Sequence, residues 1–582
     1  MIIFTEEFKI YVLPWISLSV TLYIAYYVYT NILCAIHDKI KVRRIIHKKQ
    51  KEREHAFQKL ENRYKLDAKS EKILQLPLDQ LLTELRKRKL TAIEVLDAFM
   101  AKALKETREY NSITEFVPQA HIWAAQLDDL KEVRGPLHGL PISVKDNCNI
   151  EGMDSTLGFA KYLYKPEIEN ANLIASLKDL GAIVFCKTNV PQSLFCWGCG
   201  NPIFGETRNP FNRLLSPGGS SGGEASLIAS GGSALGIGTD IGGSCRIPAH
   251  MCGVSGFKPT KMRLSPVGFK STVSGVVGLN GGPGIISKSA GLIAAVFKEL
   301  TMPGVQNKYD RLTVPITWDE KTFTSAKPLR IGYYTSLKFF PAVGDTEKVV
   351  LDAKSALEAE GHILVPFEMG DGFDVAELVS DFAYADDGYN SLKIWKDEPI
   401  AQSAIFHYVM CRIPRCVRRF LAYIMSCKCL PTFYFYSTRV AAFFRGGATK
   451  SRELWSSMEK RRQILEDVLA QWHRLNLDLV LCPTFAFASV PIKAAGKLKP
   501  ACIYTMIWNL LDFPVGTVSF GTESGTKVDS YDNEDDFLLK TAQKALKSSA
   551  GMPIGVQVVG LPFQEEVVLR AMKELEYLRS IK

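Results

Sequence analysis

The sequence has few of the patterns that hold metals, phosphates or disulfide frameworks. Its thirteen cysteines are an odd number scattered over 582 residues, and only Cys196 and Cys199 form a C-x-x-C, without the second pair that a zinc site needs. No cluster of His, Cys and carboxylates has metal-ligand spacing, and no GxxxxGK[ST] phosphate loop occurs. We therefore expect free structural thiols in a reducing compartment, no metal and no cofactor.

Acidic residues are absent from one long segment, and positive charge is concentrated in two places. Asp38 to Arg53 holds eight Lys/Arg and two acids, and residues 399–452 hold nine Lys/Arg and no acid. Because the formal net charge is only +10, the remaining chain is net acidic, which argues against a nucleic-acid-binding surface. With 47% hydrophobic residues, the composition is that of a globular protein with a large core, in one large α/β domain or two to three smaller ones.

Charge of either sign is missing from the N-terminal run between Ile10 and Ile36. This run exceeds the roughly 20 residues with which an apolar helix crosses a bilayer. It is too long for a cleaved signal peptide, and acidic residues precede it. Basic residues follow it, so the positive-inside rule predicts a single-pass anchor over residues 1–37 with the body of the protein in the cytoplasm. The alternative is a buried or interfacial helix.

Beyond the anchor we expect a basic, charged linker helix over residues 38–73, of which the part from 47 to 72 is expected to be solvated. A catalytic domain is expected over residues 74–582; it begins with an amphipathic helical pattern and alternates between strands and helices from about residue 130. This alternation predicts an α/β domain with a largely parallel or mixed sheet covered by helices. The expected strands are 140–144, 182–186, 329–334, 362–367, 477–481 and 555–561, and the expected helices are 172–180, 345–360, 452–475 and 565–578.

Glycine and serine dominate residues 216–246, which read SPGGSSGGEASLIASGGSALGIGTDIGGSCR. Apolar pairs inside this segment argue against a flexible linker, and the third glycine of GxGxxG is missing. Gly218–Gly222 matches the GxSxG nucleophile elbow, which requires a preceding strand. Asn209-Pro210 and Ser216-Pro217 instead predict a loop there, so an α/β-hydrolase triad is disfavoured.

Taken together, six segments resemble the amidase signature family, and within it the membrane-anchored fatty-acid amide hydrolases. The segments are GLPISVKD (139–146), DSTLG (154–158), TNVPQS (188–193), SPGGSSGGE (216–224), GTDIGGSCR (238–246) and GMPIGVQ (551–557). The resemblance extends from about residue 70 to the C-terminus and includes the N-terminal membrane segment. It implies an amidase-signature fold, with a large twisted mixed sheet covered by helices on both faces. It also implies a homodimer at an intracellular membrane such as the endoplasmic reticulum.

The same resemblance implies a Ser–Ser–Lys triad, with Ser244 as the nucleophile, Ser220 as the bridging serine and Lys145 as the base. The implied substrates are long-chain fatty-acid amides, such as anandamide and oleamide, which are cleaved to a fatty acid plus an amine or ammonia. By position, the implied oxyanion-hole donors are the N–H groups of Ile241, Gly242, Gly243 and Ser244, and the implied acyl-channel residues are Leu194 and Phe195.

This triad makes chemical sense only if Lys145 is neutral, since a serine hydroxyl needs a base to become a nucleophile. Burial lowers a lysine pKa, and the apolar neighbours Ile142 and Val144 are consistent with burial. A bridging hydroxyl can both donate and accept a proton. We expect Asp240 and Arg246, which flank the nucleophile motif, to form structural hydrogen bonds or an ion pair that positions this loop.

Residues 404–446 combine ten Phe/Tyr with seven Lys/Arg and no acid. Such a segment suits an interfacial cap on an anionic leaflet, and Pro414 and Pro431 make a membrane span improbable. The resemblance implies that a lipid amide enters here. The alternative is a pair of core helices near a basic surface.

Two stretches depart from the family pattern: residues 271–288, and Cys196-Trp197 near the implied acyl channel. Both put substrate preference in doubt. The competing functions are a lipid esterase or another amidase on the same scaffold, including the soluble glutamine-amidase subunit, and a catalytically inactive, membrane-anchored lipid-binding protein.

Overall fold

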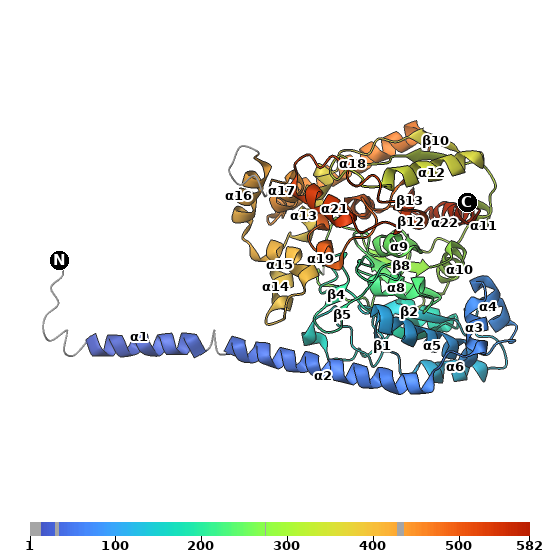
Figure 1. Cartoon of the computed structure of the whole chain (residues 1–582), viewed down its shortest axis with the longest axis horizontal. Coiled ribbons are helices and arrows are strands. Elements are labelled where there is room, and N and C mark those ends of the chain that lie inside the picture. The colour runs from blue at the N-terminus through green and yellow to red at the C-terminus, as the bar shows by residue number, and fades with distance from the viewer. Residues whose placement is uncertain (1–12, 30–33, 274, 428–435, 582) are drawn as a thin grey trace.

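The computed structural model describes residues 13–29, 34–273, 275–427 and 436–581, and one large mixed sheet runs through it (Figure 1). Within the described residues this sheet has eleven strands, in the order β1-β3-β2-β6-β8-β7-β12-β13-β11-β9-β10. The strands are β1 (Ile113–Phe116), β2 (Pro141–Lys145), β3 (Ile183–Thr188), β6 (Leu235–Asp240), β7 (Ser255–Lys258), β8 (Gly282–Ser287), β9 (Arg330–Tyr333), β10 (Ile363–Pro366), β11 (Leu479–Pro483), β12 (Val515–Thr522) and β13 (Pro553–Gly560); β4 (Gly200–Asn201) and β5 (Gly205–Glu206) form a separate ladder.

Parallel and antiparallel pairs are mixed in this sheet. Strand β2 runs parallel to β3 and β6, and β9 runs parallel to β10 and β11. The central strands β7, β8, β12 and β13 pair in antiparallel fashion. Strands β2, β3, β11 and β13 are buried at every position, as expected for strands that are covered on both faces.

Helices cover both faces of the sheet. On β12, Gly516 faces Met572 of α22, whereas Thr517 faces the opposite side, where α9 packs on β12 and β13. The helices are α1 (Leu13–Val28), α2 (Cys34–Arg63), α3 (Ala68–Gln75), α4 (Leu78–Arg86), α5 (Ala92–Tyr110), α6 (Ala120–Asp128), α7 (Asn172–Asp179), α8 (Gly222–Ala229), α9 (Arg246–Cys252), α10 (Ala290–Thr301), α11 (Glu320–Phe323), α12 (Thr346–Ala359), α13 (Phe373–Ala383), α14 (Tyr389–Trp395), α15 (Ile405–Arg412), α16 (Arg415–Ser426), α17 (Thr438–Arg445), α18 (Ser451–Arg474), α19 (Ile492–Ala495), α20 (Ile503–Leu511), α21 (Phe537–Leu546) and α22 (Glu565–Ser580).

The elements expected from sequence patterning are confirmed to within two residues. The expected helices at 172–180 and 345–360 are α7 and α12, and Gly181 (φ +95°) and Gly361 (φ +90°) follow their ends. A positive φ at this position is the usual way to end a helix, and glycine adopts it without strain. The expected free thiols are also found, since every cysteine that the structure describes is unpaired.

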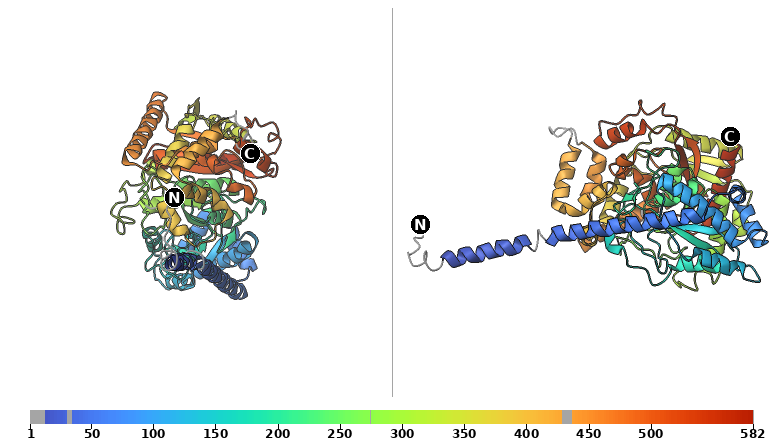
Figure 2. Two further views of the ribbon diagram at one scale, coloured as in Figure 1. Left: turned by 90° about the vertical axis from the view of Figure 1, so that its left-hand side faces the viewer. Right: turned by 60° about the horizontal axis from the view of Figure 1, so that its bottom comes forward.

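The stretch from 47 to 72, expected to be solvated, instead packs partly on the body. Helix α2 lies along the body (Figure 2), and Phe57 is only 3% exposed. The Arg53 guanidinium donates to the carbonyls of Ile113 and Thr114 on the edge strand β1, and Lys49 pairs with Glu115 at 2.6 Å. Charged side chains of α2 thus bind the edge of the sheet, a role that charge patterning alone could not distinguish from solvation.

The anchor predicted for residues 1–37 lies partly outside the described residues, which omit 1–12 and 30–33. Its described part includes α1, which projects away from the body and exposes Trp15 and Tyr23 (Figures 1 and 2). Among the helices that the structure describes, none combines the length and apolar composition of a membrane span.

Candidate active site

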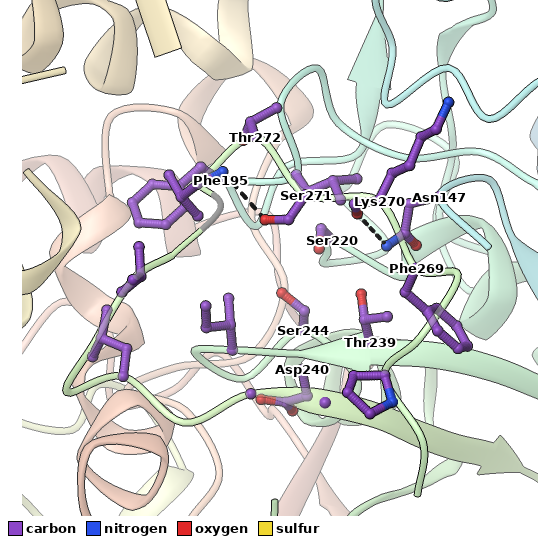
Figure 3. A pocket seen from close by; sticks show the side chains of 18 of the residues that line it. Asn147, Phe195, Ser220, Thr239, Asp240, Ser244, Phe269, Lys270, Ser271 and Thr272 are labelled. Carbon is purple, nitrogen blue, oxygen red and sulfur yellow. Dashed lines mark hydrogen bonds between the residues drawn. The ribbon is translucent and has the colours of Figure 1, made fainter. Parts of the chain in front are cut away.

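Two parallel strands bring motif residues that are distant in the sequence to one cavity of about 260 Å³ (Figure 3). Strand β2 ends at Lys145 and β6 ends at Asp240, and the pair is in register at Ser143 and Gly236. Since parallel strands end at the same edge of a sheet, Lys145 lies beside Thr239. The cavity is formed at this edge by Asn147, Leu194, Phe195, Ser220, Thr239, Ile241, Ser244 and residues of the 269–283 segment.

Lys145 is fully buried behind the cavity, and its amine has three oxygen neighbours. Its Nζ lies 2.7 Å from Ser220 Oγ, 2.7 Å from Thr239 Oγ1 and 3.3 Å from the Thr239 carbonyl oxygen. Burial lowers the pKa of Lys145 to about 8, because the protonated form loses its hydration. A minor fraction of this lysine is therefore neutral near physiological pH, and only the neutral form can act as a base.

Ser220 and Ser244 both face the cavity, from two loops that are tied together (Figure 3). Ser220 follows Gly219 through a cis peptide bond and is almost completely buried, whereas Ser244 is partly exposed. The Ser221 N–H donates to the Ser244 carbonyl at 3.1 Å. Ser244 is thus the serine that a ligand in the cavity can reach.

An ion pair organises the loop that carries Ser244, as the sequence predicts. The Arg246 guanidinium donates two hydrogen bonds of 3.0 Å to the Asp240 carboxylate, and both side chains are fully buried. Burial by itself would raise the pKa of Asp240, but the charge and hydrogen bonds of Arg246 outweigh it and hold the pKa well below its ordinary value. The carboxylate also accepts the N–H groups of Gly243 at 2.7 Å and Cys245 at 3.1 Å. The chain is thereby folded tightly between β6 and α9.

These contacts change the donor set expected for an oxyanion hole. The Gly243 N–H already donates to Asp240, so its expected role as an oxyanion donor is not supported by this geometry. The N–H groups of Ile241, Gly242 and Ser244 donate to no acceptor in the described part of the chain. Three backbone donors therefore remain beside Ser244. The sequence could not reveal that Gly243 differs from the other three donors, because this depends on the Asp240 carboxylate pointing toward the Gly243 N–H.

Replacing Gly243 by alanine tests the geometry of this loop. Its φ is +112°, and a Cβ there would lie 2.1 Å from Thr505 Oγ1, which donates to the Gly242 carbonyl at 2.7 Å. We expect Gly243→Ala to displace the neighbouring N–H donors and lower kcat by about 10²–10³-fold, the usual cost of losing an oxyanion donor. Steady-state kinetics on folded protein measure this effect.

Gly370→Ala is the matched control, since a Cβ at Gly370 meets nothing within 4 Å. This variant should keep its wild-type kcat. A Gly243→Ala enzyme with full kcat and unchanged thermal stability would contradict the role assigned to the loop.

The implied acyl-channel residues do lie at the cavity. Leu194 and Phe195 line it, and they also line a narrow apolar extension that includes Trp197 and Met506. Ser193 and Leu194 both have positive φ. The Thr272 hydroxyl donates a hydrogen bond of 2.8 Å to the Ser193 carbonyl. The atypical 271–288 stretch therefore contacts the implied channel directly.

A buried carboxyl, Glu224, ties the Ser220 loop to the sheet. It accepts hydrogen bonds from Ser143 of β2 and from Thr188 of β3, the latter at 2.8 Å, and burial raises its pKa to about 8. Gly236 of β6 is required beside it, since a Cβ there would lie 1.9 Å from Glu224 Oε2. Sequence reasoning missed this contact, although Glu224 ends the SPGGSSGGE segment.

Sequence reasoning missed other residues at the cavity. Thr239 lies within the GTDIGGSCR motif and could have been suspected, because it precedes Asp240 at the end of a strand. Lys499, Met506 and Thr272 stand in no motif, and only the folded chain brings them to the cavity and its extension. Across the described residues, no group of three or more His, Cys, Asp or Glu could hold a metal ion.

The sequence and the fold match a known class of hydrolase. Residues 94–569 match the Amidase family, so the chain belongs to that family and is an amidase-family hydrolase. It is 35% identical over 520 residues to fatty-acid amide hydrolase 1 from Sus scrofa, covering 88% of this chain and 87% of the relative. It is 34% identical over 512 residues to fatty acid amide hydrolase 1 from Caenorhabditis elegans, covering 86% and 88%.

Solved structures show the same fold. A fatty acid amide hydrolase superposes with a TM-score of 0.76 at 22% identity, covering 94% of this chain and 95% of that one. A 6-aminohexanoate cyclic dimer hydrolase superposes with a TM-score of 0.65 at 21% identity, covering 87% and 97%. The expected amidase-signature α/β fold, a large mixed sheet flanked by helices, is confirmed.

Proposed function

We propose that the protein is a membrane-associated serine hydrolase that cleaves long-chain fatty-acid amides, both N-acylethanolamines and primary amides, through an acyl-enzyme. The observation that carries the proposal is the buried Lys145 amine, 2.7 Å from Ser220 Oγ, at the back of the cavity that Ser244 faces. The sequence relationship to fatty-acid amide hydrolases supports the substrate class.

Activation of the nucleophile begins at Lys145. When neutral, its two N–H bonds point to the two oxygens of Thr239, and its lone pair accepts the Ser220 hydroxyl proton. Ser220 in turn accepts the proton of Ser244 as Ser244 Oγ attacks the amide carbon. Thr239 is thus a positioning residue that aims the lysine lone pair at Ser220.

The attack places negative charge on the substrate oxygen, and the N–H groups of Ile241, Gly242 and Ser244 stabilise it. Collapse of this intermediate breaks the C–N bond, and Ser220 returns a proton to the departing nitrogen, which leaves as amine or ammonia. Water then attacks the acyl-enzyme: Ser220 passes the water proton to Lys145, and returns a proton to Ser244 Oγ as the acyl–oxygen bond breaks. The products are the fatty acid and free Ser244.

Two features on the same side of the body support membrane association. Helix α1 projects there with exposed apolar side chains, and α16 exposes Phe420 and Tyr423 (Figure 1). Helices α15, α16 and α17 carry the basic 404–446 cap, whose residues 428–435 lie outside the described chain. We propose a cytoplasmic-facing homodimer at an intracellular membrane such as the endoplasmic reticulum, with a catalytic domain beginning near residue 74.

The substrate class is tested by measuring how kcat/KM depends on the length of the acyl chain. Each buried CH₂ contributes roughly 0.8 kcal/mol, so we expect kcat/KM to rise by about 10²-fold or more from N-butanoylethanolamine to N-oleoylethanolamine. Hydrolysis of the radiolabelled amides by membranes expressing the wild type measures this ratio.

Membranes expressing Ser244→Ala at matched levels give the background. Equal kcat/KM for short and long amides would exclude a lipid substrate. Faster hydrolysis of matched oleoyl esters, with inert amides, would identify a lipid esterase instead.

A further inference from the structure

One buried lysine near the active site, Lys499, has no role in the proposed mechanism. Lys499 begins the short 3-10 helix η6 (Lys499–Cys502), which leads into α20, and it is only 4% exposed. It lines the narrow extension of the cavity together with Phe195, Met506 and Ser244. Lys499 is therefore part of the mainly apolar lining that also includes Ser244, and its Nζ is buried within that lining.

The Lys499 amine is unsatisfied. Five lysines are buried in the described chain, and four of them bond to protein oxygens. Lys145 bonds to Ser220 and Thr239, Lys49 to Glu115, Lys187 to the Asp154 carbonyl, and Lys258 to the Pro259 carbonyl. Lys499 Nζ alone has no hydrogen-bond partner among the described residues. A buried polar group without a protein partner needs an explanation, such as an ordered water, a bound ligand or a function.

The groups around Lys499 do not supply a counter-charge. Its Nζ lies 4.1 Å from the ring centroid of Phe195 and 5.6 Å from that of Phe406. The nearby titratable groups are thiols and an imidazole: burial raises the pKa of Cys196, Cys411 and Cys502 and lowers the pKa of His407, so all are neutral near pH 7. Burial also lowers the pKa of Lys499 to about 8, which leaves the amine mostly protonated at that pH.

Aromatic rings compensate a buried cation only in part. Contact with ring faces stabilises an ammonium group less than hydrogen bonds to charged or carbonyl oxygens do. A plain hydrocarbon chain in this extension would cover the ammonium without giving it an acceptor. An oxygen atom on the chain would complete its coordination.

We propose that Lys499 binds an oxygen acceptor on the acyl chain of the substrate, so that the enzyme prefers oxygenated fatty-acid amides over plain ones. A carboxylate is the strongest such acceptor and a hydroxyl the neutral form of the same chemistry. The position of Lys499 among the apolar residues Phe195 and Met506, the side on which the acyl chain is expected, assigns the acceptor to the chain rather than to the amine. This inference rests on the proposed function and makes its substrate class narrower.

The test compares wild type, Lys499→Met and Lys497→Met. Met keeps the length of the lysine stem and removes the charge, and Lys497 is an exposed lysine two residues away that does not line the extension. The substrates are N-stearoylethanolamine and its mid-chain hydroxylated, terminally hydroxylated and terminally carboxylated counterparts, with N-stearoylglycine carrying a carboxylate on the amine side instead. The readout is kcat/KM for each oxygenated amide divided by that for the plain amide.

We expect wild type and Lys497→Met to prefer at least one oxygenated chain, and Lys499→Met to lower that ratio by about 10–100-fold, the range for a charge-assisted hydrogen bond. Equal ratios in all three proteins would overturn the inference. A wild-type preference for the plain chain would also overturn the inference, and this result can be obtained even if neither variant folds. An effect of Lys499 that is confined to N-stearoylglycine would overturn the assignment to the acyl chain.

Labelling of Ser244 by a fluorophosphonate separates this outcome from failure of the proposed function. All three proteins should label at similar rates if they are folded. If they label but cleave no amide, the proposed substrate is wrong, and protection against labelling by stearic acid or its hydroxylated and carboxylated counterparts still measures the contribution of Lys499. Protection that is independent of both the chain oxygen and Lys499 then overturns the inference.

Discussion

Replacement of Ser244 by alanine should lower kcat by on the order of 10⁴-fold or more, the largest effect expected from any single substitution. The serine that attacks the amide is the only group at the cavity that forms a covalent bond with substrate in the proposed reaction, and loss of such a nucleophile leaves only binding and oxyanion stabilisation. Ser244 is partly exposed to the cavity, whereas Ser220 is almost completely buried. Purified variants and radiolabelled N-oleoylethanolamine measure the effect.

Two further results accompany this loss. Ser230→Ala, at the end of α8 and outside the cavity, should retain wild-type turnover. A fluorophosphonate should label the wild type on Ser244 and leave Ser244→Ala unlabelled. Labelling of another serine, or turnover above a tenth of wild type in Ser244→Ala, would move the nucleophile elsewhere.

Replacement of Lys145 by methionine should lower kcat/KM by about 10²–10⁴-fold, the usual contribution of a general base. The pH dependence carries the more specific expectation. Lys145 acts only when neutral, and burial lowers its pKa to about 8. As pH falls below that value, the neutral fraction decreases about tenfold per unit, so wild-type kcat/KM should fall with it and level off at higher pH.

In Lys145→Met, the residual kcat/KM should no longer fall as pH decreases below about 8. A merely structural role of Lys145 would not explain the loss of this pH dependence. Lys497→Met, at an exposed lysine, should keep both the rate and the profile of the wild type. A wild-type profile that is flat between about pH 6 and 9 would remove Lys145 from the role of base.

The 404–446 cap, which we propose to be membrane-associated, contacts the cavity. Phe406 of α15 lies within 5.6 Å of Lys499 Nζ, and the ring of Phe195 contacts that of His407 at 4.5 Å. The cap segment therefore packs directly on the apolar extension of the cavity. This contact supports entry of the acyl chain from the side of the body on which α16 exposes its aromatic residues.

Much of this protein follows from local sequence. The expected strands and helices match β2, β3, α7, α12 and α18 closely, because apolar periodicity and glycine ends depend on neighbours in the chain. The motif residues Lys145, Ser220 and Ser244 could be selected by resemblance, and all three gather at the ends of β2 and β6. The Asp240–Arg246 pair was also predictable, since the two opposite charges are six positions apart and flank one tight loop.

Other features required the tertiary structure, because they depend on contacts between distant segments. The charges of α2 suggested solvation, and only the edge of β1 shows what Arg53 binds. The engagement of Gly243 by Asp240 depends on the direction of one side chain. Lys499 is an ordinary lysine in sequence, and its burial beside Phe195, about 300 positions away, is decided by packing of the cap and α20 on the sheet. Its unsatisfied amine is therefore visible only in the folded chain.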